Sequence, residues 1–193
     1  MKPTGNTATH PAANARRTTI NVSGRSPTTP AAFKRTYYPA IERLCAETGL
    51  SPLFVAAQAA LESGWGAHAI GNNLFGITAD RRWKGPRRIV TTTEYRNDDR
   101  GSAEFVRVHS VTQLPDGRYR YVVDRAFRDY ATVEECLRDH FRVLSSERYR
   151  QAMQYRDQVR RFAYEIARAG YCTADPTHYA DSIDAIARMI ERL

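Results

Sequence analysis

Two glutamates, Glu62 and Glu94, occupy local sequence surroundings that suit different roles in acid–base catalysis, one as a protonated acid and the other as an ionised carboxylate. Glu62 ends a strongly apolar stretch, whereas Glu94 lies in a polar, Thr-rich stretch that we expect to be solvated and ionised. Carboxyl pairs whose surroundings push their pKa values apart are typical of glycoside cleavage, in which one carboxyl donates a proton. Because the two glutamates are distant in the sequence, only the fold can bring them to one site. The alternative for Glu94 is an ion pair with an Arg of its own hairpin.

The segment before Glu62 predicts a buried helix with clear ends. Ser51 suits the cap position and Pro52 the first helical turn. Residues 53–61 are apolar on almost every side, which is typical of a helix that is buried all round. Gly64 suits a left-handed cap, so Glu62 falls in the last turn. There the helix dipole and partial burial are expected to raise its pKa, although a lone glutamate in a last turn is more often an ordinary surface residue.

Several short motifs then follow in a fixed order over residues 33–193. They are Ala60-Leu-Glu-Ser-Gly-Trp-Gly66, Asn72-Asn-Leu-Phe-Gly76, Trp83-Lys-Gly-Pro86, Thr91-Thr-Thr-Glu-Tyr95, Phe127-Arg-Asp-Tyr130 and Ala169-Gly-Tyr171. With these motifs the chain resembles glycoside hydrolase family 73, the peptidoglycan β-N-acetylglucosaminidases, which include the muralytic domain of the flagellar rod-assembly protein. The resemblance implies a lysozyme-like α+β fold, in which a mainly helical body and a small inserted antiparallel β-lobe form a substrate cleft.

The resemblance also implies a reaction and a set of site residues. The reaction is hydrolysis of the β-1,4 bond between N-acetylglucosamine and N-acetylmuramic acid. Glu62 corresponds to the catalytic acid, Glu94 to a base or stabiliser of the reacting centre, and Tyr171 to a tyrosine near the cleaved bond. The residues expected to bind substrate are Trp65, Asn73, Phe75, Trp83 and Tyr130. For the loop aromatics, stacking on sugars and pinning the loop to the core are equally open. The loop after Tyr171 carries one residue more than the family pattern and must bulge.

Other mechanisms and functions fit parts of the same pattern. The 2-acetamido group of the substrate could itself attack the reacting carbon, which would lessen the need for Glu94 as a base. A lytic transglycosylase or a muramidase would share the acid and the fold, and a non-catalytic cell-wall-binding module is a further alternative. No Cys-x-x-Cys or Cys/His ligand spacing predicts a metal site, and no cofactor is expected.

Composition limits the partners and the location. A net charge of +8 and a pI near 9.7 favour a polyanionic partner, such as nucleic acid, an anionic membrane surface or the cell wall. The sequence carries no nucleic-acid-binding motif, no stretch long enough to span a membrane and no ordinary secretory signal. We therefore expect peptidoglycan strands as the partner. The expected location is the periplasm or cell wall, reached through a secretion, flagellar or phage lysis apparatus, with a phage-encoded protein as one possibility.

The remaining pattern predicts one domain preceded by a tail. Residues 1–30 read as a disordered tail and 31–193 as the catalytic domain. Residues 88–124 predict a β-lobe of about three strands, which we expect to move as a lid. Helices are predicted at 32–48, from the capping box at Thr132, at 157–169 and from Asp175 onward, with a broken helical segment at 149–155. Cys45 and Cys136 are expected as buried thiols and His140 as a core residue.

Overall fold

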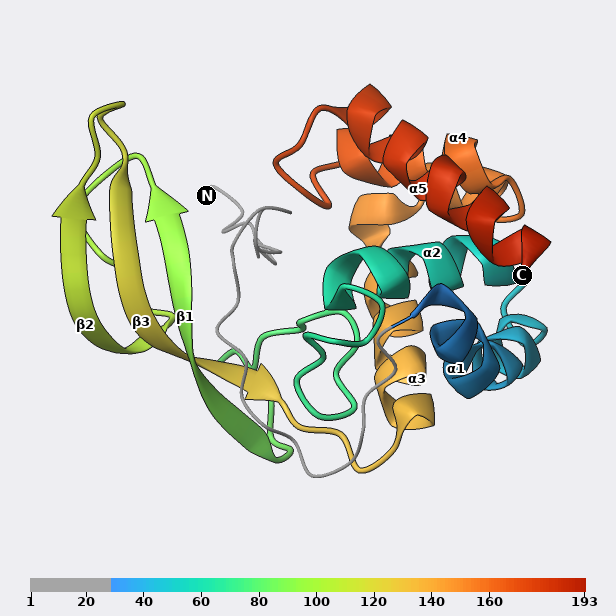
Figure 1. Ribbon diagram of the computed structural model, residues 1–193, viewed down its shortest axis with the longest axis horizontal. Helices are drawn as coiled ribbons and strands as arrows, with labels where there is room; N and C mark the ends of the chain where they lie inside the picture. Colours follow the sequence, from blue (N-terminus) through green and yellow to red (C-terminus); the bar gives the residue numbers. More distant parts are fainter. Residues whose placement is uncertain (1–28) are drawn as a thin grey trace.

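The computed structural model describes residues 29–193, which form a helical body with a three-stranded antiparallel sheet projecting from one side (Figure 1). This is the α+β arrangement predicted from the sequence. The predicted tail, residues 1–30, lies almost entirely outside the described residues. No helix within residues 29–193 combines the length and apolar character that crossing a membrane requires.

Helix α2 (Pro52–Ser63) lies at the centre of the body and contacts α1 (Pro30–Cys45), α4 (Val159–Arg168) and α5 (Pro176–Arg192). Its predicted ends are confirmed. The Ser51 hydroxyl accepts a hydrogen bond from the Phe54 amide, and Gly64 ends the helix in the left-handed region with φ of 57°. Burial of Phe54, Val55 and residues 56–60 then fixes the helix in the core.

The C-terminal half supplies the other helices of the body. Helix α3 (Val133–Leu144) is capped by Thr132, whose hydroxyl accepts from the Glu135 amide. The predicted broken segment consists of two 3-10 turns, η1 (Glu147–Tyr149) and η2 (Ala152–Tyr155). The Asp175 carboxylate caps α5 by accepting from the amides of residues 177 and 178. The enlarged loop after Tyr171 therefore ends in a regular helix start.

The sheet consists of β1 (Arg87–Arg96), β2 (Phe105–Gln113) and β3 (Tyr119–Arg128) in the order β1-β3-β2. The three predicted strands are confirmed, but β3 continues four residues beyond the predicted end of the lobe at Asp124. Side chains on β3 alternate strictly between buried and partly exposed positions from residue 121 on, as expected for a central strand with one covered face. Nearly every residue of the edge strand β2 is exposed, and its register shifts twice.

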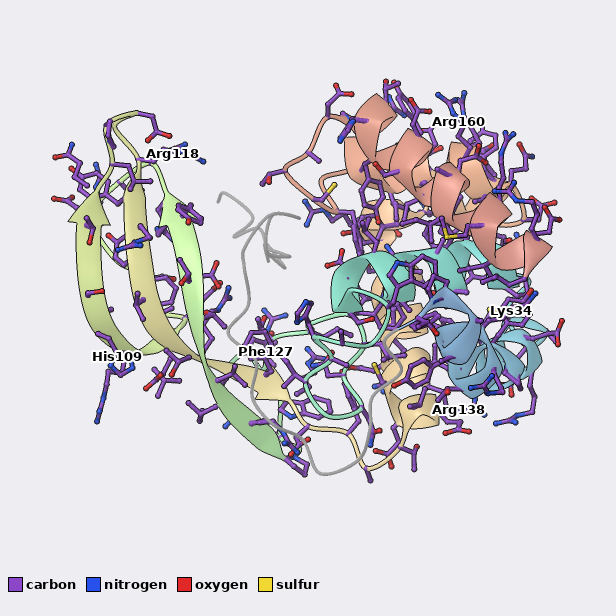
Figure 2. The ribbon with its side chains drawn as sticks, in the orientation of Figure 1. Lys34, His109, Arg118, Phe127, Arg138 and Arg160 are labelled. Atoms are coloured by element: carbon purple, nitrogen blue, oxygen red, sulfur yellow. The ribbon has the colours of Figure 1, made fainter. Side chains whose placement is uncertain are left out.

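The last residues of β3 join the sheet to the body. The Ala79 amide donates to the Ala126 carbonyl at 2.9 Å, and the Arg128 amide donates to the Ile77 carbonyl at 3.0 Å. Phe127 is 2% exposed and packs with Ile70 and Val90 in a small apolar cluster. Figure 2 shows Phe127 where the sheet meets the helical body. This junction fixes the base of the lobe and leaves the rest of the sheet projecting.

Candidate active site

Glu62 occupies the last turn of α2 and is partly buried, as the sequence predicts. The C-terminal end of α2 is directed toward the sheet (Figure 1). Two buried tyrosines of the body lie within range of its charge. Burial is the main cause that raises the pKa of Tyr171 and of Tyr179 well above the usual value, and the negative charge of Glu62 adds to the rise in both. Glu62 therefore lies at the rim of an aromatic part of the core.

Tyr171 is completely buried. Its ring centroid lies 6.1 Å from the rings of both Tyr149 and Tyr179 and 6.4 Å from the ring of His140. The predicted position beside the cleaved bond therefore needs correction, because a side chain with no exposed surface cannot touch a sugar in this arrangement. The enlarged loop that follows does not bring it to the surface, and Tyr171 can influence the site through Glu62.

Glu94 lies on β1 with only 17% of its side chain exposed. Its Oε1 atom accepts from Arg125 Nη1 at 3.1 Å and from the Thr92 hydroxyl at 3.3 Å. The second guanidinium nitrogen of Arg125 donates to Glu104 at 2.9 Å. The prediction of a solvated Glu94 was wrong, because an Arg that is itself buried draws the carboxylate inward. The ion pair with a hairpin Arg, which the sequence left open, is present.

A groove of about 1500 Å³ separates the sheet from the body, and neither Glu62 nor Glu94 is among its lining residues. Glu94 contacts a lining residue directly, whereas Glu62 lies near Tyr171, which in turn packs against one. Arg125 lines the groove and bonds Glu94, whereas Tyr149 lines it and packs against Tyr171, next to Glu62. The lining comes from residues 76–84, 87, 89, 103–106, 125, 126, 128, 143 and 146–149.

Three of the predicted substrate-binding residues belong to the interior instead. Asn73 is fully buried, and its side-chain amide bonds only backbone atoms, at 2.9 Å each. Phe75 is also fully buried and stacks on His140 at a centroid distance of 3.7 Å. Tyr130 is 5% exposed and donates its hydroxyl to Asp139 at 2.5 Å. We therefore correct these three assignments: the side chains pin the loop and the strand end to the core.

The two tryptophans are partly exposed. Trp65 packs edge-on against Phe33 at 5.7 Å and has φ of 58°, unusual for a residue other than glycine. Trp83 lines the groove, donates its ring N–H to the Pro86 carbonyl at 2.8 Å and lies under the Arg128 guanidinium at 4.7 Å. Of the five predicted contacts, Trp83 therefore has the best position to meet a ligand in the groove.

A buried polar chain that was not predicted from the sequence positions α2. Gln58 is fully buried: its amide nitrogen donates to the Tyr179 hydroxyl at 2.9 Å, and its oxygen lies 2.7 Å from Nε2 of His140. The prediction of His140 as a core residue is confirmed. The signal was available, because Gln58 is the one polar residue in an apolar run one turn before Glu62. These bonds fix α2 against α3 and α5 and thereby place Glu62.

The described residues offer no metal site of their own. Within residues 29–193, no group of three or more His, Cys, Asp or Glu side chains could hold a metal ion. Cys45, Cys136 and Cys172 are all free thiols.

Comparison with known proteins identifies the family. The Glucosaminidase family model, described as mannosyl-glycoprotein endo-beta-N-acetylglucosaminidase, matches residues 38–192. The chain belongs to the glucosaminidase family. The resemblance to glycoside hydrolase family 73 is thereby confirmed, and with it the membership in a family of glycoside hydrolases.

Relatives extend the family match. The peptidoglycan hydrolase FlgJ of Vibrio parahaemolyticus is 33% identical over 171 residues, which cover 85% of this glucosaminidase chain and 48% of FlgJ. FlgJ of Vibrio cholerae is 34% identical over 163 residues, which cover 80% of this chain and 42% of that FlgJ. The chain thus spans about half the length of these relatives. A C-terminally truncated glycoside hydrolase domain of Salmonella typhimurium FlgJ shares the fold with a TM-score of 0.63 and 26% identity, covering 86% of this chain and 99% of that one. The predicted lysozyme-like α+β fold is confirmed.

Proposed function

We propose that this protein is an endo-β-N-acetylglucosaminidase that hydrolyses peptidoglycan between N-acetylglucosamine and N-acetylmuramic acid. The family match gives the reaction class, and the FlgJ relatives are named peptidoglycan hydrolases. The observation that carries the proposal is the position of Glu62. A single carboxyl group ends the central helix on the side of the sheet, behind the lining of a groove large enough for a polymer.

Glu62 is proposed as the general acid. The carbonyl end of a helix and a partly buried position both disfavour an anion, which suits a carboxyl group that must deliver a proton to the leaving oxygen. Tyr171 and Tyr179 add apolar surface behind it. Removing water from a proton-transfer site in this way strengthens the local electrostatic interactions.

The first step is proposed to use the substrate's own acetamido group. Its oxygen attacks the reacting carbon as the glycosidic C–O bond breaks and the leaving oxygen takes the proton from Glu62. Water then opens the cyclic intermediate and gives a proton back to the Glu62 carboxylate. Oxygen Oε1 of Glu94 already accepts two hydrogen bonds, from Arg125 and Thr92. This arrangement favours Glu94 as a fixed negative charge that stabilises the positively charged reacting centre rather than as the base that activates water.

Analysis of the products by mass tests the proposed function against its alternatives. Digestion of purified peptidoglycan is expected to release fragments with reducing N-acetylglucosamine ends. Anhydro-muramyl ends would identify a lytic transglycosylase, and reducing N-acetylmuramic acid ends a muramidase. Absence of new ends, with binding retained, would identify a wall-binding module.

The proposed place of action is the cell wall, from the periplasmic side. The likeness to the muralytic domain of the flagellar rod-assembly protein favours a flagellar setting over a general secretion or phage lysis setting. Fractionation of cells that produce the chain, followed by detection in the periplasmic and cytoplasmic fractions with and without intact flagellar genes, tests this assignment.

A further inference from the structure

The groove between sheet and body carries an excess of positive charge. Seven basic residues line it, and all but Arg125 and Arg128 form no ion pair with any residue of the described part of the chain. The five without an ion pair are Arg81, Arg82, Lys84, Arg87 and Arg148. All five are exposed, so their charges are available to a ligand.

Two of these cations are held in place by neutral partners. Arg87 donates to the backbone carbonyl of Asp80 at 3.1 Å and to that of Trp83. Arg148 donates to the carbonyls of residues 169 and 170 at 2.7 Å each. Carbonyl groups orient a guanidinium without neutralising it. Both arginines are therefore ordered and keep their full positive charge.

The acidic residues of the groove are engaged elsewhere. The Asp80 carboxylate accepts from the backbone amides two and three residues later at 3.0 Å. Glu104 bonds Arg125 at 2.9 Å, and Glu147 bonds Arg150 at 3.0 Å. The lining holds three acidic residues against seven basic ones, so the groove presents a net positive wall.

We infer that this groove binds the carboxylates of the peptide stems that peptidoglycan carries on its muramic acid residues, an inference that rests on the proposed function. Its volume of about 1500 Å³ exceeds the roughly 300–1,000 Å³ of small-molecule pockets, which suits a branched polymer. Arginine forks match carboxylates in pairs. Trp83 supplies an apolar face between the cations. The groove thus distinguishes wall strands that bear acidic stems from neutral glycan.

The test compares two forms of one substrate. Peptidoglycan freed of other wall polymers is used as isolated and after its carboxylates have been converted to amides. The groove variant is Arg81→Gln/Arg82→Gln. The matched control is Arg107→Gln/Arg120→Gln, which removes the same charge from exposed positions on β2 and β3 outside the groove.

Release of reducing ends gives kcat/KM for each pair of enzyme and substrate. The wild type is expected to prefer the untreated polymer by about 10-fold. The kcat/KM of the groove variant on the untreated polymer is expected to fall ~3- to 10-fold, mainly through a higher KM, which is the size expected for the loss of two exposed charge pairs. Its kcat/KM on the amidated polymer is expected to change little. The control is expected to keep the wild-type preference.

Three outcomes separate this inference from the proposed function. Equal cleavage of both polymers by the wild type overturns the inference and leaves the proposed function intact. The same conclusion follows if the control variant loses as much kcat/KM on the untreated polymer as the groove variant does. No cleavage of either polymer contradicts the proposed function. Calorimetric binding of N-acetylmuramyl-tetrapeptide, with and without amidated carboxylates, then decides the inference alone. Binding that is weakened by amidation and by Arg81→Gln/Arg82→Gln supports it, and unchanged binding overturns it.

Discussion

The Arg125 guanidinium lies 3.1 Å from Oε1 of Glu94, although only 4% of the Arg125 side chain is exposed. A charge in such a position needs a partner, because an uncompensated buried charge is costly. Glu94 therefore has a structural role as well as a proposed electrostatic one. The two roles can be separated by measuring stability and activity in the same variants.

For Glu94→Gln we expect a loss of activity of about 10-fold, clearly smaller than that for Glu62→Gln, because an acetamido-bearing substrate supplies its own nucleophile. Binding to wall fragments should persist and weaken with salt, since a net charge of +8 is screened over about 10 Å at 0.1 M. Glu104→Gln, which alters the other partner of Arg125, is the control. Equal losses in Glu94→Gln and Glu62→Gln would show an obligatory base and exclude the substrate-assisted route.

Glu62→Gln is expected to keep the fold and to lower kcat by about 10²- to 10⁴-fold, because an amide of the same shape cannot donate the proton. Clearing of a peptidoglycan suspension measures the rate, and thermal unfolding measures the fold. Glu191→Gln, at an exposed position of α5, serves as control and should retain wild-type activity. Wild-type clearing by Glu62→Gln would remove the acid assignment.

The β-lobe is expected to exchange its amide hydrogens faster than the central helix. The edge strand β2 is exposed at nearly every position, whereas α2 is buried on most sides. Elements with little buried surface open at low free energy and serve as lids. Hydrogen exchange followed by mass spectrometry compares residues 88–124 with 52–62. Equal protection of the two segments would contradict a mobile lid.

Asp139 is expected to be the most sensitive ionic position of the body. Its side chain is 4% exposed and bonds Arg128 at 2.6 Å and Tyr130 at 2.5 Å. Asp139→Ala should lower the free energy of unfolding by about 3–5 kcal/mol, because Arg128 loses a buried partner. Asp181→Ala, which breaks an exposed pair with Arg160, should cost less than about 1 kcal/mol. Urea unfolding measures both, and equal costs would disprove the difference.

Thiol reactivity should follow burial. Burial raises the pKa of Cys45 and of Cys136 to about 12, so both remain protonated at neutral pH. At pH 8 an alkylating reagent should label only the partly exposed Cys172 in the folded protein, and Cys172→Ser should remove this signal. Labelling of Cys45 or Cys136 without denaturant would contradict the assignment.

The same two thiols give stability a dependence on alkaline pH. Their pKa values are raised on folding, so their contribution is complete below the unfolded value of about 8.5 and is lost as pH rises toward 12. Replacing both residues with Ala should reduce the loss of stability between pH 8.5 and 11. An unchanged slope would show that other groups cause it.

Local signals explain why α2 could be predicted closely. Ser51 and Gly64 mark its ends through bonds to nearby residues, and such bonds do not depend on the rest of the fold. The surroundings of Phe75 and Tyr130 could not be predicted in the same way. An aromatic side chain in a loop can face solvent or the core, and the choice depends on its partners. The partner of Phe75 is His140, more than 50 residues away in the sequence, and the partner of Tyr130 is Asp139, about 10 residues away. For Glu94 the sequence left two surroundings open, solvent or an Arg of the hairpin, and the choice depends on Arg125 from another strand.

The edge strand β2 has a consequence for how copies of the molecule meet. It presents Val106, Val108 and Val111 at 44–58% exposure beside a row of backbone groups that pairs with no other strand of residues 29–193. Such a strand is a template for aggregation through intermolecular β-pairing. The register shifts at 105/107 and 108/110 interrupt the row, and Arg107 adds charge to it. These irregularities hinder β2 from pairing with a strand of another copy of the molecule at high concentration. A straight β2 would make the sheet more regular but would lower the solubility of the protein.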